Sequence, residues 1–165
     1  MNGKLVSKVW IFSLILAMLL VASGCGGKAA SAAELPVYPG AVELKPGEDP
    51  IADTLAKNME QDATLRKNIG VGGGMEQKVY RLPADGSWDA VKAYYDKELT
   101  AAGWKAGMGG IAGNIASQAL EAANQGNDMI KTTMWSKGKQ IFTIFRLLET
   151  PDATQAYLII SLNSN

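Results

Sequence analysis

The feature that most constrains this chain is a single cysteine that follows an almost unbroken apolar segment near the N-terminus. Lys4 and Lys8 precede the segment, which runs over residues 9–22 as VWIFSLILAMLLVA. Its 14 residues fit the apolar region of a secretory signal peptide and are fewer than the ~20 that a membrane-spanning helix needs. Small residues then lead to Cys25. We therefore expect residues 1–24 to be removed and to take no part in the folded domain.

The residues around the cysteine resemble the lipobox of bacterial lipoproteins, in which small residues precede a cysteine that is acylated and becomes the new N-terminus. Ala22, Ser23 and Gly24 supply the small residues, although the family usually has Leu where this chain has Ala22. A thiolate is also the nucleophile that can take up a lipid group. The resemblance implies lipidation of Cys25 and an extracytoplasmic protein anchored to a bacterial membrane, the outer membrane if the host has two. The alternative is an uncleaved anchor with an incidental cysteine.

Cleavage before Cys25 would leave a chain the size of one domain, which we divide into a lipidated flexible tether over 25–34 and a single folded domain over 35–165. Residues 26–34 read GGKAASAAE, which is small and polar without an apolar period. Acylation of the only cysteine excludes a disulfide, so apolar packing must hold the domain together. The cleaved segment carries two of the 16 basic residues and none of the 16 acidic ones, so the mature net charge is −2. That balance gives no overall attraction to nucleic acid or to anionic lipid.

Apolar residues at helical spacing predict three helices. The first covers residues 50–69, and the third, rich in Gly and Ala, covers 111–124. The second has the clearest ends, because Ser87 is a good N-cap and Gly103 is a natural residue just past the C-terminus. The expected buried positions are Ile51, Leu55, Met59, Leu65 and Ile69 in the first helix, and Trp88, Val91, Tyr95 and Leu99 in the second.

Four strands complete the expected elements. They cover residues 75–82, 130–136, 140–148 and 156–162, with Lys137-Gly138 as a two-residue hairpin signal. The simplest architecture for this order is α+β: a single, mostly antiparallel sheet of about four strands, covered on one face by two or three helices.

A second resemblance concerns the folded domain. Its residues are LPVYPGA over 35–41, then Tyr80, the pair Tyr94-Tyr95, Leu99 and Gly103-Trp104. They resemble those of a group of extracytoplasmic bacterial proteins that share a YPGA segment and a helix ending in GW, and whose chemistry is not established. The resemblance covers about residues 35–105 and the hairpin more loosely. It implies a fold and a location but transfers no active site.

The composition argues against an enzyme. The chain has no histidine, which removes the usual general base and the commonest metal ligand, and acylation of Cys25 would remove thiol chemistry. Ser136 and Lys139 match S-x-x-K, a spacing that serves serine acyl transferases when it lies at a helix N-terminus. Here the motif falls on an expected β-turn, where a charged hairpin tip is the ordinary explanation. We therefore expect no catalytic residue.

Two further patterns are compatible with small ligands but have ordinary explanations. Residues 107–112 match the dinucleotide motif G-x-G-x-x-A, without the buried strand that must precede it. Glu48, Asp49 and Asp53 could offer oxygen ligands to calcium, although acidic residues before a helix also complement its dipole. We therefore expect neither a cofactor nor a metal.

The most unusual pattern is a stripe of small residues, because Gly109, Gly113 and Ser117 are spaced by four. Such a stripe lets another backbone approach closely, either within the domain or at an interface. Tyr94 lies off the expected buried face of its helix and is the aromatic residue most available to a partner. These four residues are the candidate interface.

Together these features favour a non-enzymatic envelope module that binds or scaffolds a partner at the membrane surface. The expected partners are the membrane itself, reached through the N-terminal lipid, and an envelope protein or an apolar ligand, but not nucleic acid. A carrier that holds a small apolar or lipid ligand between helices and sheet is the alternative, and a Ser/Lys hydrolase is a distant third.

Overall fold

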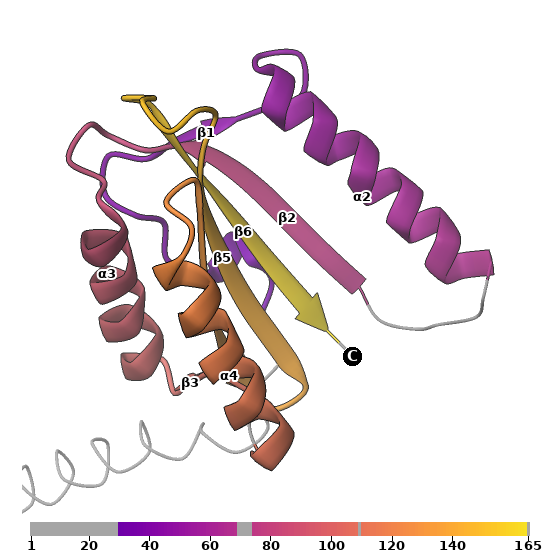
Figure 1. Cartoon of the computed structure of the whole chain (residues 1–165). Coiled ribbons are helices and arrows are strands. Elements are labelled where there is room, and N and C mark those ends of the chain that lie inside the picture. The colour runs from indigo at the N-terminus through magenta and orange to yellow at the C-terminus, as the bar shows by residue number, and fades with distance from the viewer. Residues whose placement is uncertain (1–29, 69–73, 109, 165) are drawn as a thin grey trace, which may run out of the picture.

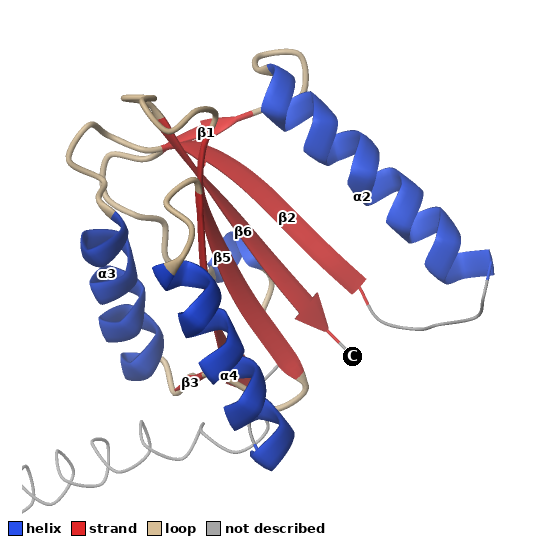
Figure 2. Ribbon diagram, in the orientation of Figure 1, coloured by secondary structure: helices blue, strands red, loops and turns tan. Residues whose placement is uncertain are grey.

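The computed structural model describes residues 30–68, 74–108 and 110–164, and in them a six-stranded antiparallel sheet is flanked by three helices (Figures 1 and 2). The strands are β1 (Val42–Leu44), β2 (Gly74–Arg81), β3 (Lys105–Ala106), β4 (Ile130–Lys137), β5 (Gln140–Leu148) and β6 (Ala156–Ser164). The helices are α2 (Pro50–Asn68), α3 (Trp88–Ala101) and α4 (Gly110–Gln125), and a short 3₁₀ helix, η1, covers Ala32–Glu34. All the helices and strands expected from the sequence are present, with ends that agree to within two residues.

Neighbouring strands are antiparallel throughout, in the spatial order β1-β2-β6-β5-β4-β3. Strands β4, β5 and β6 follow one another as a meander, and β2 pairs with the other side of β6. The α+β class with a single antiparallel sheet is therefore confirmed. The expected number of about four strands is too low, because β1 and β3 are only three and two residues long. Such short runs show no alternation that a sequence could reveal.

Helices lie on both faces of the sheet, where the sequence analysis expected them on one (Figure 1). Successive side chains of a strand point to opposite faces. The cross-strand partners Tyr80 and Leu158 belong to the core cluster under α3, whereas their neighbours Val79 and Ile159 belong to the cluster under the start of α2. The reason for this correction is β6, whose residues 156–162 are all buried. A strand that is apolar on both sides needs cover on both.

The expected buried face of α3 is confirmed, since Val91, Tyr95 and Leu99 are fully buried and Trp88 is half-buried. The Tyr95 ring lies 6.0 Å from the Trp135 ring and 5.5 Å from the Phe142 ring, measured between centroids. Burial raises the pKa of the Tyr95 hydroxyl. Aromatic rings at these separations attract one another beyond the area that they bury, so this cluster fills the space between α3 and the sheet.

Both ends of α3 close as the sequence predicts. The Ser87 side chain accepts a hydrogen bond from the Ala90 N–H at 3.2 Å, which satisfies one of the free donors of the first turn. After the helix, Gly103 has a φ of +82°, a conformation that favours glycine at this position. Trp104 then turns back into the core and is 4% exposed. The GW pair of the resemblance therefore ends the helix and closes the core.

Helix α2 is anchored to the sheet at its start and exposed at its far end. Asp49, just before the helix, is buried, and its carboxylate accepts hydrogen bonds from both helix and sheet. The donors are the Ile51 N–H at 2.9 Å, the Arg81 guanidinium at 3.1 Å and the Tyr157 hydroxyl at 3.3 Å. Burial, and then the negative charge of Asp49, raises the pKa of Tyr157, so its hydroxyl stays a donor. The apolar face expected along α2 stops short, because Leu65 is 58% exposed, and Ile69 lies outside the described residues.

Replacement of Leu99 by alanine tests the assignment of the buried face of α3. Leu99 is 0% exposed, so Leu99→Ala should lower the free energy of unfolding by about 2–5 kcal/mol through lost contacts and the cavity left behind. Lys97→Ala is the matched control on the same helix, because the Lys97 side chain is 82% exposed, and it should change stability by no more than about 0.5 kcal/mol. Urea denaturation of both variants measures the difference, and equal midpoints would refute the assignment.

Candidate functional site at the tether end of the sheet

The chain that follows the expected lipidation position is docked on the sheet from Ala30 onward. The Gln140 side chain makes a pair of hydrogen bonds with Ala30, accepting from its N–H at 2.9 Å and donating to its carbonyl at 2.7 Å. Ala32 is buried in the core, and its N–H donates to the Glu76 carboxylate at 3.0 Å. Folded contacts therefore begin at Ala30 rather than at residue 35, where the sequence analysis placed the end of the flexible tether.

Gln140 lies at the tip of the β4–β5 hairpin, directly opposite Lys137 in the strand register. The two turn residues are Gly138 and Lys139, one position later than the Lys137-Gly138 pair that the sequence indicated. Gly138 has a φ of +61°, which suits the first central residue of a tight hairpin turn. The hairpin therefore places two lysines, Lys137 and Lys139, beside the point where the N-terminal segment joins the domain.

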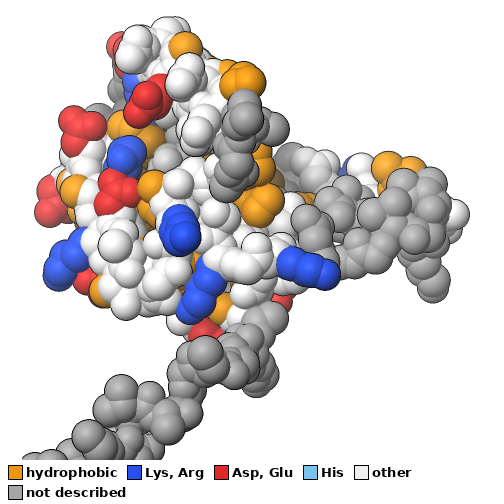
Figure 3. Space-filling model, turned by 90° about the horizontal axis from the view of Figure 1, so that it is seen from below, with side chains coloured by type: hydrophobic (Ala, Val, Ile, Leu, Met, Phe, Trp, Pro, Cys, Tyr) orange, Lys and Arg blue, Asp and Glu red, His pale blue; other side chains and the backbone are white. Residues whose placement is uncertain are grey.

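Figure 3 views the molecule from the end where β3 and this hairpin lie. Lys and Arg side chains are spread across this end, while most of the acidic side chains in view lie toward the left of the picture. A shallow hollow of about 540 Å³ opens here. Its lining residues are Gly103, Lys105, Met108, Ser136, Lys137, Gly138, Lys139, Gln140 and Ile141. We call Lys105, Lys137 and Lys139 the tether-end lysines.

The tether-end lysines differ from most other lysines of the described chain in their partners. Lys137 donates a hydrogen bond to the Ala102 carbonyl at the end of α3, at 2.7 Å, where a cation complements the helix dipole. Among the described residues, none of the three forms an ion pair with a carboxylate. By contrast, ion pairs with carboxylates occupy the ammonium groups of Lys78, Lys92, Lys97 and Lys131. The hollow therefore brings together three lysines that have no carboxylate partner among the described residues.

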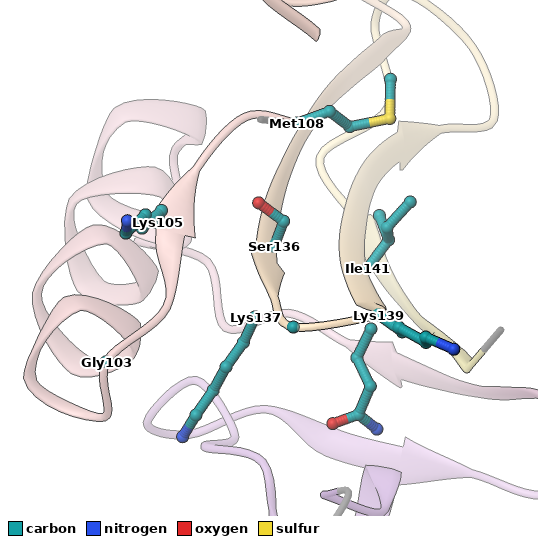
Figure 4. Close-up of a pocket in the computed structure, with 9 residues that line it drawn as sticks. Gly103, Lys105, Met108, Ser136, Lys137, Lys139 and Ile141 are labelled. Carbon is teal, nitrogen blue, oxygen red and sulfur yellow. The ribbon is translucent and has the colours of Figure 1, made fainter. Parts of the chain in front are cut away.

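Ser136 and Lys139, the S-x-x-K pair, lie in this hollow but do not converge. Figure 4 shows the Ser136 hydroxyl and the Lys139 ammonium pointing away from one another, on opposite sides of the hairpin. No hydrogen bond joins them, because Ser136 lies in β4 whereas Lys139 lies in the turn that follows the strand. A lysine must approach the hydroxyl to activate it as a nucleophile, so this arrangement gives the motif no catalytic geometry.

The small residues of α4 fit closely against the loop that leads into the helix. Gly113 is buried, and a Cβ added there would overlap the carbonyl and side chain of Met108. Ser117 donates a hydrogen bond back to the Gly113 carbonyl at 2.9 Å and faces Gly107. The third member of the stripe, Gly109, lies outside the described residues. Gly113 and Ser117 thus contact their own domain.

Helix α4 also protects an edge of the sheet. The Asn124 side chain accepts a hydrogen bond from the Thr132 N–H at 2.8 Å and donates one to the Thr132 carbonyl at 2.7 Å. These are the backbone groups that an additional strand would use, so the amide occupies an exposed edge of β4. The rest of α4 is mostly exposed, and Ile115 is 65% exposed.

Tyr94, the fourth candidate interface residue, holds the YPGA segment in place. Its hydroxyl donates to the Val37 carbonyl at 2.8 Å, and its ring meets the Tyr38 ring edge to face, with centroids 5.4 Å apart. Tyr94 is half-buried as a result. The resemblance to the YPGA…GW group therefore has a packing explanation in this chain, since Tyr38 and Tyr94 join the segment to α3.

The dinucleotide-like motif and the acidic cluster, which the sequence suggested as small-ligand sites, both have local structural roles. Residues 107–112 follow β3, which is an exposed two-residue edge strand and not the buried strand that a dinucleotide site needs. Asp49 is committed to the anchor of α2, while the Glu48 and Asp53 carboxylates accept from backbone N–H groups of the preceding loop. Among the described residues, no group of three or more acidic side chains is placed to hold a metal ion.

Cys25 lies outside the described residues. In the described part of the chain, no helix combines the length and the apolar character needed to cross a bilayer. Searches against known protein families, curated proteins and solved structures found no match to this chain.

Sequence reasoning missed the Gln140–Ala30 contact and the position of Lys105. One signal was present for Gln140, which shares its strand face with Phe142 and Ile144 and is 7% exposed. A polar residue at a core position needs hydrogen-bond partners, so its place in the alternation could have indicated a contact. The identity of that partner could not have been found, because Ala30 lies 110 residues away in the sequence.

Replacement of Gly113 by alanine tests the close contact in α4. Alanine is the better helix former, but the added methyl would meet the Met108 backbone, so Gly113→Ala should lower the free energy of unfolding by about 1–3 kcal/mol. Gly126→Ala is the control, because a Cβ at Gly126 would meet nothing within 4 Å; that variant should be neutral or slightly stabilising. Thermal unfolding measures both, and a rise in melting temperature for Gly113→Ala would contradict the contact.

Proposed function

We propose that this protein is a lipid-anchored extracytoplasmic lipoprotein whose domain is a non-enzymatic binding or scaffolding module, held against the membrane surface. The observation that carries the proposal is the docking of Ala30 on Gln140. Ala30 is the fifth residue after Cys25, and five extended residues span at most about 18 Å. An acyl chain on Cys25 would therefore keep the hairpin end of the sheet close to the bilayer.

The side chains of the domain support a binding role more than a catalytic one. The Ser136–Lys139 pair does not converge, and no histidine is present in the sequence. The core between α3 and the sheet is filled by aromatic rings, which leaves the surface as the place where partners are met. A folded module on a short tether suits a scaffold, because its position relative to the membrane is nearly fixed.

The second candidate function is to carry a small apolar ligand. The partly exposed apolar face of the sheet under α2 favours this function. Helix α2 covers this face only in part, so that the apolar side chains Met134, Ile141, Phe145 and Leu147 stay partly exposed and Ile130 is 44% exposed. Native mass spectrometry of the protein purified from its host separates the two functions. A co-purifying lipid of defined mass supports the carrier, and an empty domain that crosslinks to an envelope protein supports the scaffold.

The anchor itself is tested by Cys25→Ser. The hydroxyl of serine is a far weaker nucleophile than a thiolate, so we expect the variant to accumulate as an unacylated precursor. Intact-mass measurement of the protein extracted from membranes reports the acyl chains directly. A Cys25→Ser protein that is cleaved and acylated like the original would refute the proposed anchor.

The docking of the N-terminal segment is tested by Gln140→Ala. The side chain makes hydrogen bonds to Ala30 and to the Ser164 hydroxyl, so its loss should lower the free energy of unfolding by about 1–3 kcal/mol. Hydrogen exchange at the Ala30 amide should become faster in the variant. Gln61→Ala, at an exposed position of α2, is the control. Unchanged exchange at Ala30 in Gln140→Ala would show that the segment is held by other contacts.

A further inference from the structure

We propose that the tether-end lysines, Lys105, Lys137 and Lys139, are a contact surface for the phosphate headgroups of anionic lipids and orient the domain on the bilayer. This inference rests on the proposed function, because it requires the acylated Cys25 that brings this end of the molecule to the membrane. The committed partner is the surface of a membrane that contains anionic phospholipid. Net charge alone argued against such a partner; the distribution of charge in the fold argues for it.

The position of the N-terminal segment selects which face meets the lipid. Ala30 is bonded to Gln140, and Gln140 is the strand partner of Lys137. The segment from Ala30 back to Cys25 is too short to pass around the domain, because it spans about 18 Å at most. The hairpin end must therefore face the bilayer whenever the protein is anchored.

Charge complementarity points to the same partner. The tether-end lysines form no ion pair with a described carboxylate, so their charge is available within a Debye length of the headgroups. Two carboxylates, those of Glu34 and Glu76, also lie near the N-terminal segment. Each accepts a hydrogen bond from a backbone N–H of that segment, at Ser31 and at Ala32.

The directions of the side chains favour a lipid surface over a single small anion. In Figure 4 the ammonium groups of Lys105, Lys137 and Lys139 diverge from the hollow instead of converging on one point. A free phosphate would need donors that meet around it, whereas separate headgroups can each meet one lysine. Met108 and Ile141 line the hollow between the lysines and offer apolar contact at the boundary between headgroups and acyl chains.

The test uses the mature acylated protein added to preformed vesicles, either of phosphatidylcholine alone or of phosphatidylcholine with phosphatidylglycerol. A membrane-impermeant amine reagent labels exposed lysines, and mass spectrometry measures the rate at each one. Lys105 and Lys139 should react at least about threefold more slowly on the anionic vesicles, as expected for amines held at an anionic surface. Lys57, which lies on α2 and is exposed, should react equally on both.

A matched pair of variants separates contact from general stability. Lys137 should also be protected from the reagent on anionic vesicles in the unaltered protein. Lys105→Gln with Lys139→Gln should abolish that protection, whereas Lys57→Gln with Lys97→Gln should leave it intact. Equal labelling of the tether-end lysines on the two kinds of vesicle, in protein that stays bound, would overturn this inference and leave the anchor standing. Absence of acyl chains on Cys25 would overturn the proposed function and this inference together. Protection by inorganic phosphate without vesicles would assign the lysines to a small-anion site instead.

Discussion

Burial of β6 on both faces is the constraint around which the domain is arranged. Residues 156–162 are buried without interruption, so apolar side chains project from this strand in both directions. On one face α3 supplies a row of fully buried residues, and on the other the first turns of α2 cover Tyr157 and Ile159. The Asp49 carboxylate holds α2 in this position by bonding to Arg81 and to Tyr157 itself. Removal of either helix would expose apolar side chains of a central strand. Both helices are therefore needed to cover β6, although they bury unequal parts of it.

The sequence predicts the elements of this fold better than their arrangement. Long elements with clear periodicity or caps, such as α3 between Ser87 and Gly103, were found with nearly correct ends. The continuous apolar run of β6 was also visible in the sequence and indicated a strand buried on both sides. The predicted architecture nevertheless placed the helices on one face of the sheet only. Strands β1 and β3 could not be found, because they are too short to show a pattern and they pair with β2 and β4, which are distant in the sequence.

The same distinction applies to the candidate functional residues: a local pattern predicts some of their contacts, whereas others depend on residues that are distant in the sequence. Gly113 was correctly expected to have a close neighbour, because glycine inside a helix is costly unless something requires it, and the neighbour is the backbone of Met108. Tyr94 was expected to be available but instead binds the YPGA segment, a contact across 57 residues that no local pattern reveals. The tether-end lysines come from β3 and from the β4–β5 hairpin. Only the folded sheet brings them together.

In the proposed arrangement, the net charge of −2 expected after cleavage before Cys25 is compatible with a basic surface that faces the membrane, because the proposed anchor removes the need for strong attraction. A free domain would have to meet the entropic cost of association with a few lysines alone, and its acidic remainder would oppose the approach. A chain acylated at Cys25, as we propose, would already sit at the bilayer, so the lysines would act at a high effective concentration of headgroups and would need only to bias the rotation of the domain. That bias is useful only if the lysines and the tether share one end of the molecule. The pairing of Lys137 with Gln140, and of Gln140 with Ala30, places them there.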